Sequence, residues 1–359
     1  MATTIKKRTV KIGRKKVKLL AVTLVLFLAT YAHGASGTKE LFSSDEVIRI
    51  ELRSDFSAIL KDRDEDPEYH NAELIWFTGE NEKSSLSVKL MARGAFRLKP
   101  SNCNFPPLLV NFKKNEVKDT PFEGQNKLKL VTPCQAEEDL IDEYMVYKLY
   151  NEVTDLSFRV RLVRILYYDT SKDKPLFEKY SFFIEDKDDV AERNNLTARD
   201  RVATPFDINS DNYLKLSLFQ YLIGNRDWFV SSRKNIELLQ PADTTGGIYA
   251  VPYDFDFSAF VNAPYSRPWG VTQEFISERR FYKGICFSEE QFNEAFEFFR
   301  KLKPVFTSII SSQELMSKSN RRELLNYINE FYAIINSRYL FKQNFLSVCE
   351  TRKDYNLPE

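Results

Sequence analysis

The sequence predicts an α+β protein in which strands dominate the first half of the chain and helices the second. Three observations lead to this prediction. Between residues 46 and 186, apolar and polar residues alternate through several runs rich in β-branched and aromatic side chains, which is typical of strands. A stretch at 136–151 breaks this alternation with an acidic start and helical spacing. From about residue 208, amphipathic segments predict helices, interrupted once at 224–257.

The elements are expected in this order along the chain. The predicted strands are VIRIELRSDFSAIL, ELIWFTG, LSVKLMARGAFRL, PPLLVNFKK, KLKLVTPC, FRVRLVRILYYD and KYSFFIED. A helix follows at SDNYLKLSLFQYLI and stops at Gly224, a natural C-terminal stop, and two or three more helices follow residue 288. The prediction is therefore a β-rich part with one helix at 46–204 and a helical part at 205–359.

The first 34 residues are typical of an export signal. They hold eight Lys or Arg and no acid, then an apolar run at 19–32 and small residues at 32 and 34. A cleaved signal at 1–34, followed by a linker at 35–45, predicts an exported protein whose body lies outside the cytosol, periplasmic or extracellular. The alternative is an uncleaved N-terminal membrane anchor.

Charge and cysteine content narrow the function classes. Without residues 1–34 the chain has 44 basic against 51 acidic residues, a net charge of about −7, so nucleic acid is not an expected partner. The four cysteines match no zinc spacing; in an exported chain we expect a disulfide between Cys103 and Cys134, with free buried thiols as the alternative. His33 and His70 are the two histidines, which argues against histidine-dependent catalysis and histidine-rich metal sites.

The stretch at 224–257, GNRDWFVSSRKNIELLQPADTTGGIYAVPYDFDF, carries the strongest functional pattern. A helix ends at its start, and two short strands flank the turn sequence PADTTGG. The resulting hairpin would bring Asp227, Asn235 and Asp254 together at one end. Carboxylate and amide oxygens are the ligands that Mg²⁺ or Mn²⁺ prefers, and phosphoryl transfer uses them without histidine.

Phosphoryl transfer from ATP by a kinase also needs a basic side chain that binds the phosphates, and an acidic side chain that holds this basic group in place. Lys129 lies on a predicted strand, and Glu143 lies in the helix that follows. Lys127 shares the face of Lys129 by alternation, and Glu138 and Asp142 are rivals of Glu143, so these alternatives stay open.

The segments VKLMARGAFR, PPLLVNFKK, KLKLVTPC, EYMVYKLYN, FFIEDKD, GNRDW and PYDFDFSAFVN together resemble the spore-coat CotH family of atypical kinase-like proteins. The resemblance covers about 85–265. It implies a two-lobed protein-kinase-like fold, with a β-rich N-lobe and a mainly helical C-lobe, and ATP- and metal-dependent phosphorylation of a protein or other hydroxyl in the cell envelope. It also implies a catalytic role for Asp227, and metal binding by Asn235 and Asp254.

The chain departs from the usual kinase pattern in two ways. Seven residues separate Asp227 from Asn235, where ordinary kinases have four, and no GxGxxG occurs in the first half. Arg93 and Arg97 flank Gly94 and are candidates for phosphate contact, and Asp256 is a candidate to assist Asp254 at the metal.

Three rival functions remain at this stage. The main one is a catalytically inactive kinase-like module that binds a partner in the envelope. DFDFS also resembles the nucleophile motif of haloacid-dehalogenase-type phosphatases, but the only Asp after Asp256 is Asp354, which leaves few acids to complete such a site. A glycosidase with paired carboxylates also needs no histidine, but no pair of acids stands out from the sequence.

Overall fold

The computed structural model describes residues 40–64, 66–77, 82–243, 246–266 and 280–358. The expected signal at 1–34 and most of the expected linker lie outside these residues. Among the described helices, none is both long enough and apolar enough to cross a bilayer.

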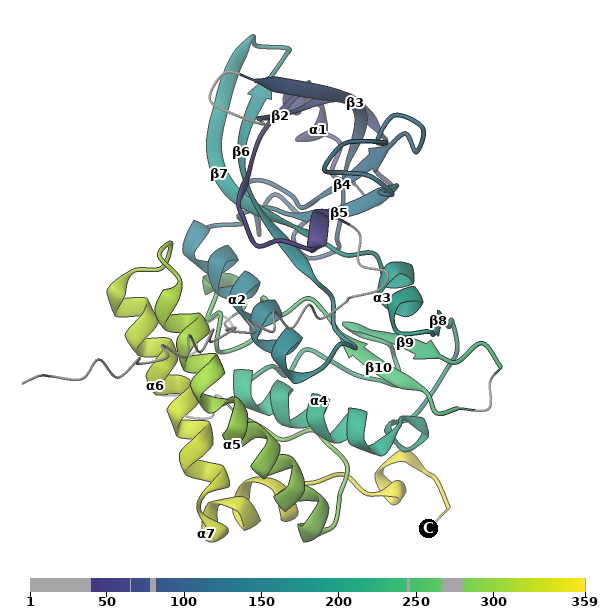
Figure 1. Cartoon of the computed structure of the whole chain (residues 1–359), viewed down its shortest axis with the longest axis vertical. Helices are drawn as coiled ribbons and strands as arrows, with labels where there is room; N and C mark the ends of the chain where they lie inside the picture. Colours follow the sequence, from purple (N-terminus) through teal and green to yellow (C-terminus); the bar gives the residue numbers. More distant parts are fainter. Residues whose placement is uncertain (1–39, 65, 78–81, 244–245, 267–279, 359) are drawn as a thin grey trace, which may run out of the picture. The chain divides into compact units, whose positions relative to one another are not determined.

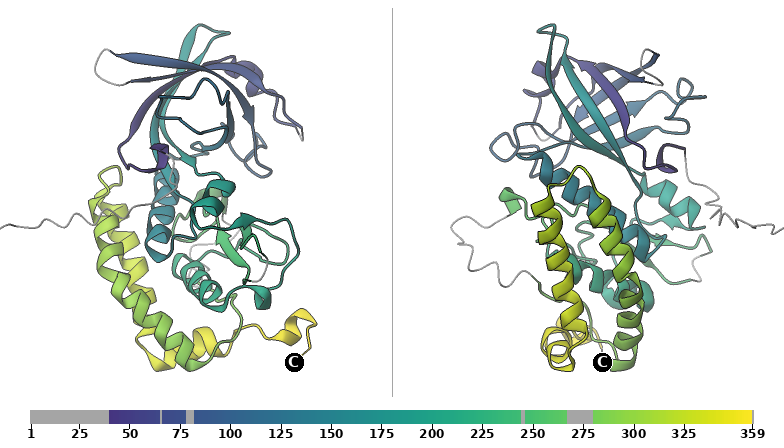
Figure 2. Two further views of the ribbon diagram at one scale, coloured as in Figure 1. Left: turned by 45° about the vertical axis from the view of Figure 1, so that its right-hand side comes forward. Right: turned by 60° about the vertical axis from the view of Figure 1, so that its left-hand side comes forward.

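The first part of the chain is a barrel of seven strands (Figure 1). Its strands are β1 (Ile48–Ser54), β2 (His70–Phe77), β3 (Lys83–Ala92), β4 (Leu108–Phe112), β5 (Lys127–Val131), β6 (Val160–Asp169) and β7 (Lys174–Ile184). They are hydrogen-bonded in the order β1-β2-β3-β4-β5-β7-β6, and β1 closes the ring by pairing in parallel with β6, Ile48 opposite Val163. Figure 2 shows the closed ring from two further sides.

The alternation seen in the sequence follows from this closure. Along β1 and β3 every second residue is buried, because one face of each strand points into the barrel. Leu52, Leu74, Leu90 and Val110 belong to the buried cluster inside, and the short α1 (Phe56–Ile59) adds Phe56 to it.

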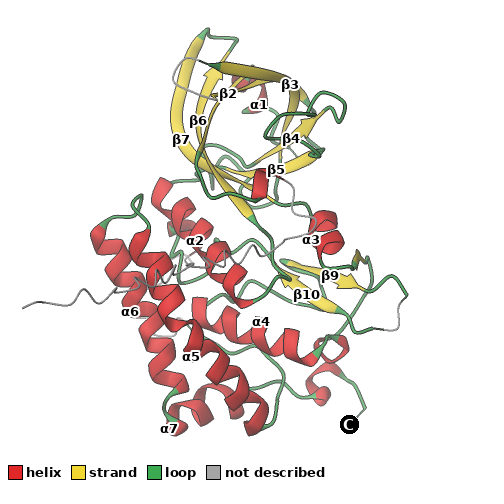
Figure 3. Ribbon diagram, viewed as in Figure 1, coloured by secondary structure: helices red, strands yellow, loops and turns green. Residues whose placement is uncertain are grey.

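The part of the chain outside the barrel contains helices and a small sheet (Figure 3). Its helices are α2 (Glu137–Val153), α3 (Lys187–Arg193), α4 (Ser210–Ile223), α5 (Glu289–Ser312), α6 (Lys318–Ile335) and α7 (Arg338–Phe341). β8 (Thr197–Ala198), β9 (Ile236–Gln240) and β10 (Tyr249–Pro252) form a small sheet of their own in the order β10-β9-β8. Shorter turns of helix lie at Glu40–Phe42, Pro205–Asp207, Pro264–Ser266, Lys342–Leu346 and Arg352–Tyr355.

A second buried cluster joins α2, α4, α5 and α6. It is rich in aromatic side chains, among them Tyr150, Phe219, Phe299 and Phe331. α5 and α6 pack as a pair through it, and both carry apolar residues at helical spacing with a serine cap at the N-terminus, Ser288 and Ser317.

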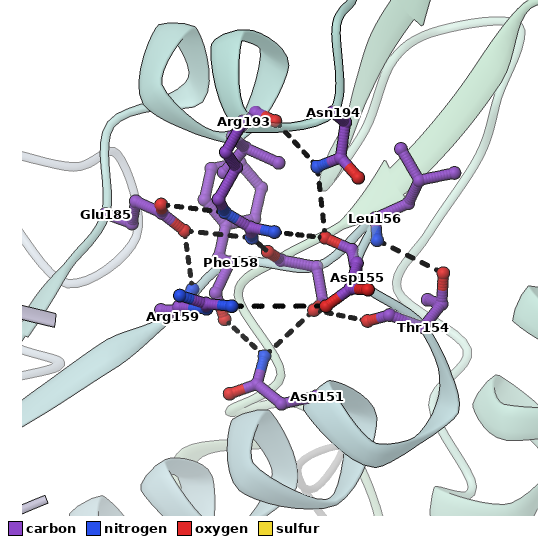
Figure 4. A network of polar contacts seen from close by, with 11 residues as sticks. Asn151, Thr154, Asp155, Leu156, Phe158, Arg159, Glu185, Arg193 and Asn194 are labelled. Atoms are coloured by element: carbon purple, nitrogen blue, oxygen red, sulfur yellow. Dashed lines mark hydrogen bonds and ion pairs between the residues drawn. The ribbon is translucent and has the colours of Figure 1, made fainter. Parts of the chain in front are cut away.

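A network of polar contacts lies where β7 ends and α3 begins (Figure 4). Glu185 and Arg193 form an ion pair at 3.0 Å, and their side chains are only 1% and 4% exposed. Arg193 also donates to the carbonyl of Asp155 at 2.6 Å, and Asn151 donates to the carbonyl of Phe158 at 2.9 Å. The network therefore ties the end of α2 and the start of β6 to α3.

The predicted two-lobed kinase-like fold is wrong. The first-half strands close into a barrel, β8 joins the predicted β9–β10 hairpin as a third strand, and all the described residues belong to one compact unit. Alternation along a strand shows which residues are buried, but it does not show which strands pair. The contact between β1 and β6 joins residues more than a hundred positions apart.

Two local predictions are confirmed, the disulfide between Cys103 and Cys134 and the end of a helix at Gly224. Cys103 and Cys134 form a disulfide, and a second one joins Cys286 to Cys349. α4 ends at Gly224 with φ +65°, a left-handed conformation that glycine adopts without strain.

Candidate active site

The β9–β10 hairpin brings its two ends together, as the sequence predicted. Ile236 lies opposite Pro252 in the ladder, and the N–H of Tyr253 donates to the carbonyl of Asn235 at 3.0 Å. Asn235 and Asp254 therefore lie at the same end of the hairpin. Both have positive φ, +55° and +61°, a region that Asn and Asp enter more readily than other non-glycine residues.

Asp227 is held against this end of the hairpin by main-chain and side-chain bonds. Its N–H donates to Oδ1 of the buried Asn225 at 2.9 Å. Nδ2 of Asn235 donates to the carbonyl of Asp227 at 2.7 Å and to its Oδ2 at 3.1 Å, and Lys234 forms an ion pair with Oδ1. The structure thus brings Asp227, Asn235 and Asp254 together.

Asp227 and Asp254 border a pocket of about 360 Å³, a volume within the range of small-molecule sites, whereas Asn235 lies behind Asp227 and does not line it. The loop that follows β3 supplies five consecutive residues, 93–97, to its wall. The full lining is Arg93, Gly94, Ala95, Phe96, Arg97, Pro107, Lys129, Val131, Tyr147, Ile184, Asp227, Lys234, Tyr253, Asp254, Asp256 and Phe257. Six residues that the sequence analysis singled out are among them: Arg93, Arg97, Lys129, Asp227, Asp254 and Asp256.

Two cations in this pocket form no direct ion pair among the described residues. No hydrogen bond or ion pair joins the side chain of Arg93 or Lys129 to a carboxylate there, and Lys129 lies 4.8 Å from the ring centre of Tyr253. Burial lowers the pKa of both side chains, and the charge of Arg93 lowers the pKa of Lys129 further. Two neighbouring cations in a partly buried pocket favour an anionic ligand.

The predicted ion pair between Lys129 and Glu143 is wrong. Glu143 is buried in α2 and faces Arg97, with 3.8 Å between Oε2 and Nη1. The same Arg97 nitrogen lies 3.9 Å from Asp256 Oδ2, and Nη2 donates to the carbonyl of Thr132. The planar guanidinium group of Arg97 extends from the 93–97 loop toward both acids. Lys129 instead lies beside the ring of Tyr253.

The buried acids of the site repel one another. Burial, with the charges of Asp256 and Asp254, raises the pKa of Glu143 well above its ordinary value, although Arg97 opposes this shift. Burial and the charge of Asp254 likewise raise the pKa of Asp256 to about 7, opposed by Arg97 and by the Tyr265 hydroxyl, which donates to Oδ2 at 3.1 Å. Added positive charge would favour the ionised form of both acids.

The remaining predicted residues take other places. Lys127 is exposed and lies 5.9 Å from the ring of Tyr69, so it does not line the pocket, although it shares the outer face of β5 with Lys129 as predicted. Asp142, the rival of Glu143, is buried on another face of α2 and accepts two hydrogen bonds from Asn320.

Several pocket residues had no distinct signal in the sequence. Tyr147 accepts a hydrogen bond from the N–H of Asp254 at 2.9 Å. Phe96, Phe257 and Tyr265 pack edge to face or tilted at 5.2–5.9 Å, and so join the 93–97 loop to the segment after β10. Aromatic residues are so frequent in this chain that their spacing alone does not separate pocket residues from the core.

The acids of the pocket fit a divalent cation in part. Within the described residues no group of three or more His, Cys, Asp or Glu is arranged as a metal site. The carboxylate of Asp254 borders the pocket and accepts no hydrogen bond from the described part of the chain, and Oε1 of Glu143 is buried without a hydrogen-bond partner. Asp254 and Asp256, with the amide oxygen of Asn235, are hard oxygen donors suited to Mg²⁺ or Mn²⁺.

Comparison with known proteins adds little to this geometry. No protein-family model matches the sequence, and no curated protein matches it. Among solved structures, the chain is similar to the crystal structure of a Helicobacter pylori proinflammatory kinase, CtkA, with 14% sequence identity over 80% of this chain and 93% of that chain. The TM-score of 0.32 is low, so this similarity carries no argument about function.

Proposed function

We propose that this protein transfers the γ-phosphoryl group of ATP to a hydroxyl group of a protein or another cell-envelope substrate. One observation carries the proposal. A single pocket is lined by two cations that form no ion pair within the described residues, Arg93 and Lys129, and by three carboxylates, Asp227, Asp254 and Asp256. A nucleoside triphosphate bound with a divalent cation has the charges that complement both groups.

Arg93 and Lys129 bind the phosphate oxygens in this proposal. Both are half-buried, so their attraction to phosphate is screened less than at an open surface. Arg97 forms ion pairs with Glu143 and Asp256. In this proposal its role is therefore to hold these two acids in place, and not to bind the nucleotide.

Asp254, Asp256 and Asn235 hold Mg²⁺ or Mn²⁺ in this proposal. When bound, the cation supplies positive charge that offsets the phosphate oxygens and the crowded acids of the pocket. The position of Asp254 supports this assignment, because its carboxylate borders the pocket and accepts no hydrogen bond from the described part of the chain.

Asp227 orients the substrate hydroxyl and takes its proton. The hydroxyl oxygen forms a bond to the γ-phosphorus, and the bond from that phosphorus to the β,γ-bridging oxygen breaks, leaving ADP. The proton of the hydroxyl passes to the Asp227 carboxylate, whose position is set by Asn225 and Asn235.

A nucleotide-binding module without catalysis is the second candidate. The specific observation in its favour is that both carboxylate oxygens of Asp227 are engaged, Oδ1 by Lys234 and Oδ2 by Asn235. A substrate hydroxyl would have to compete with these contacts.

The first test is the melting temperature of the purified full-length protein with ATP and Mg²⁺ or Mn²⁺. Ligand at a hundred times its dissociation constant stabilises the folded state by about 2.7 kcal/mol. We expect a metal-dependent shift that Asp254→Ala removes. Asp227→Asn should keep the shift but abolish transfer of labelled phosphate.

Each outcome of that test separates the candidates. A shift without phosphate transfer in the wild type would favour the binding module. Unchanged transfer in both Asp227→Asn and Asp254→Ala would overturn the assignment of the site. Absence of any shift with ATP would overturn nucleotide binding altogether.

We also propose that the protein is exported to the periplasm or the cell exterior, with an N-terminal anchor if its signal is not cleaved. The two disulfides support an oxidising compartment.

A further inference from the structure

Lys283 contacts the loop of Asp227 from outside the pocket. Its ammonium nitrogen donates to the carbonyl of Arg226 at 2.8 Å and to the carbonyl of Trp228 at 3.0 Å. These are the two peptide carbonyls on either side of Asp227. The same nitrogen lies 3.3 Å from the ring centre of Phe229. Lys283 therefore makes two contacts with the main chain on either side of Asp227 and one with a neighbouring aromatic side chain.

The segment that carries Lys283 is itself anchored to the C-terminal part of the chain. The N–H of Glu350 donates to the carbonyl of Gly284 at 3.0 Å, and the N–H of Cys286 donates to the carbonyl of Glu350 at 2.9 Å. The disulfide between Cys286 and Cys349 closes this connection covalently. The main chain next to Lys283 is therefore tied to residues 349–350 by two hydrogen bonds and a disulfide.

Two buried neighbours hold the backbone of this segment close to α4. Tyr282 is 1% exposed and packs against Tyr221 of α4, with ring centres 6.5 Å apart, and against Phe345, with ring centres 5.0 Å apart. Gly284 allows this approach, because a Cβ there would collide with the hydroxyl of Tyr282 and lie 2.9 Å from the side chain of Ser217.

The environment of Lys283 matches a fixed cation rather than a solvated one. It is half-buried, and burial lowers its pKa to about 8. Glu350 and Asp227 are the acids near it, and Lys234 and Arg226 are the cations near it. The two carbonyls that accept from Lys283 replace part of the water around its ammonium group.

We infer that Lys283 is a positioning residue that holds the loop of Asp227 in the geometry needed for phosphoryl transfer. The inference rests on the proposed function, since it takes Asp227 as the group that orients the substrate hydroxyl. Lys283 does not line the pocket, so its contribution should fall on turnover and not on nucleotide binding.

The test compares Lys283→Met, which keeps the aliphatic stem, with Lys283→Arg, which restores donors to the two carbonyls. The matched control is Lys215→Met, because Lys215 is also half-buried, pairs with Asp211 at 2.8 Å and lies 4.8 Å from the ring of Phe298, remote from the pocket. ATP turnover with Mg²⁺ and ATP affinity are measured for each full-length protein.

We expect Lys283→Met to lower kcat at least tenfold with an ATP dissociation constant within twofold of the wild type, because small displacements of a catalytic group cost large factors in rate. Lys283→Arg should recover part of kcat, and Lys215→Met should leave kcat unchanged. A wild-type kcat in Lys283→Met, or a loss of ATP affinity equal to the loss of kcat, would overturn the inference. If Lys283→Met does not fold, Lys283→Gln replaces it.

A second readout does not depend on turnover. Amide hydrogen exchange over residues 226–235 should be faster in Lys283→Met than in the wild type and unchanged in Lys215→Met. If the wild type turns over no ATP, the proposed function fails, yet this exchange result still decides whether Lys283 holds the loop. Equal exchange in Lys283→Met and the wild type would overturn the inference in either case.

Discussion

Arg97 is the residue on which the buried acids of the pocket depend. It faces Glu143 and Asp256 at 3.8 and 3.9 Å, and its side chain is only 10% exposed. A buried acid that loses its cation keeps the cost of leaving water without the compensating attraction. Arg97 therefore stabilises the acidic side of the pocket and leaves Arg93 and Lys129 for an incoming anion.

Asp142 gives the protein a predictable dependence of stability on pH. It is 4% exposed, and burial with the charges of Glu138 and Asp139 raises its pKa to about 8, although the hydrogen bonds from Asn320 oppose the shift. An acid whose pKa is higher folded than unfolded contributes stability fully below its unfolded pKa, near 4. That contribution is lost as the pH rises through the folded pKa near 8.

We therefore expect the wild type to lose about 2–4 kcal/mol of unfolding free energy between pH 5 and pH 8 relative to Asp142→Asn. Urea unfolding at both pH values measures this difference. Asp211→Asn is the control, since Asp211 is 73% exposed and should leave the pH profile unchanged. Parallel pH profiles for the wild type and Asp142→Asn would contradict the prediction.

At the scale of elements, the loop between β3 and β4 is held from two sides. Arg63 donates to four of its carbonyls, those of Arg97, Leu98, Cys103 and Asn104, at 2.7–3.2 Å. The disulfide from Cys103 to Cys134 ties the same loop to the residues just before α2. Arg97 and Glu143 lie on the two segments that this disulfide joins.

Replacing both Cys103 and Cys134 with serine should lower the unfolding free energy by about 2–4 kcal/mol, as expected for closing a loop of this length. ATP affinity should fall as well, because Arg93 and Arg97 belong to the loop that is released. Chemical unfolding and ATP titration measure the two effects.

The double variant of Cys286 and Cys349 is the matched comparison for that experiment. It leaves the β3–β4 loop tied but removes the covalent support of Lys283. We expect it to reduce kcat while ATP affinity is kept. Identical effects of the two double variants would contradict the separate roles of the two disulfides.

At the scale of the whole molecule, the described residues form one compact unit with two main buried clusters. The barrel interior is one, and the cluster around α2, α4, α5 and α6 is the other. The polar network of Glu185 and Arg193 lies where the last barrel strand continues into α3 (Figure 4).

Arg193→Met should lower the unfolding free energy by about 3 kcal/mol or more, because it leaves the buried carboxylate of Glu185 without its cation. Urea unfolding provides the measurement. Arg164→Met serves as the control, since its pair with Glu178 is 46% and 31% exposed and should contribute less than about 1 kcal/mol. Equal losses in the two variants would show that burial of the Arg193 pair is irrelevant.

Local sequence patterns determined most of the elements and the centre of the candidate site. Alternation located the barrel strands, helical spacing located α2 and α4, and turn residues between two short strands brought Asp227, Asn235 and Asp254 together. The disulfide between Cys103 and Cys134 was also predictable. Each of these features depends on residues within about thirty positions of one another, where periodicity and turn chemistry are visible.

Only the tertiary structure decided the closure of the barrel and the partners in the pocket. β1 pairs with β6, Arg97 rather than Lys129 faces Glu143, and Lys283 reaches the loop of Asp227 from 55 or more positions away. The sequence contains many arginines and lysines, so spacing alone does not show which of them meets a given acid. The path of the chain makes that choice, because it sets which cation lies within a few ångströms of a buried acid.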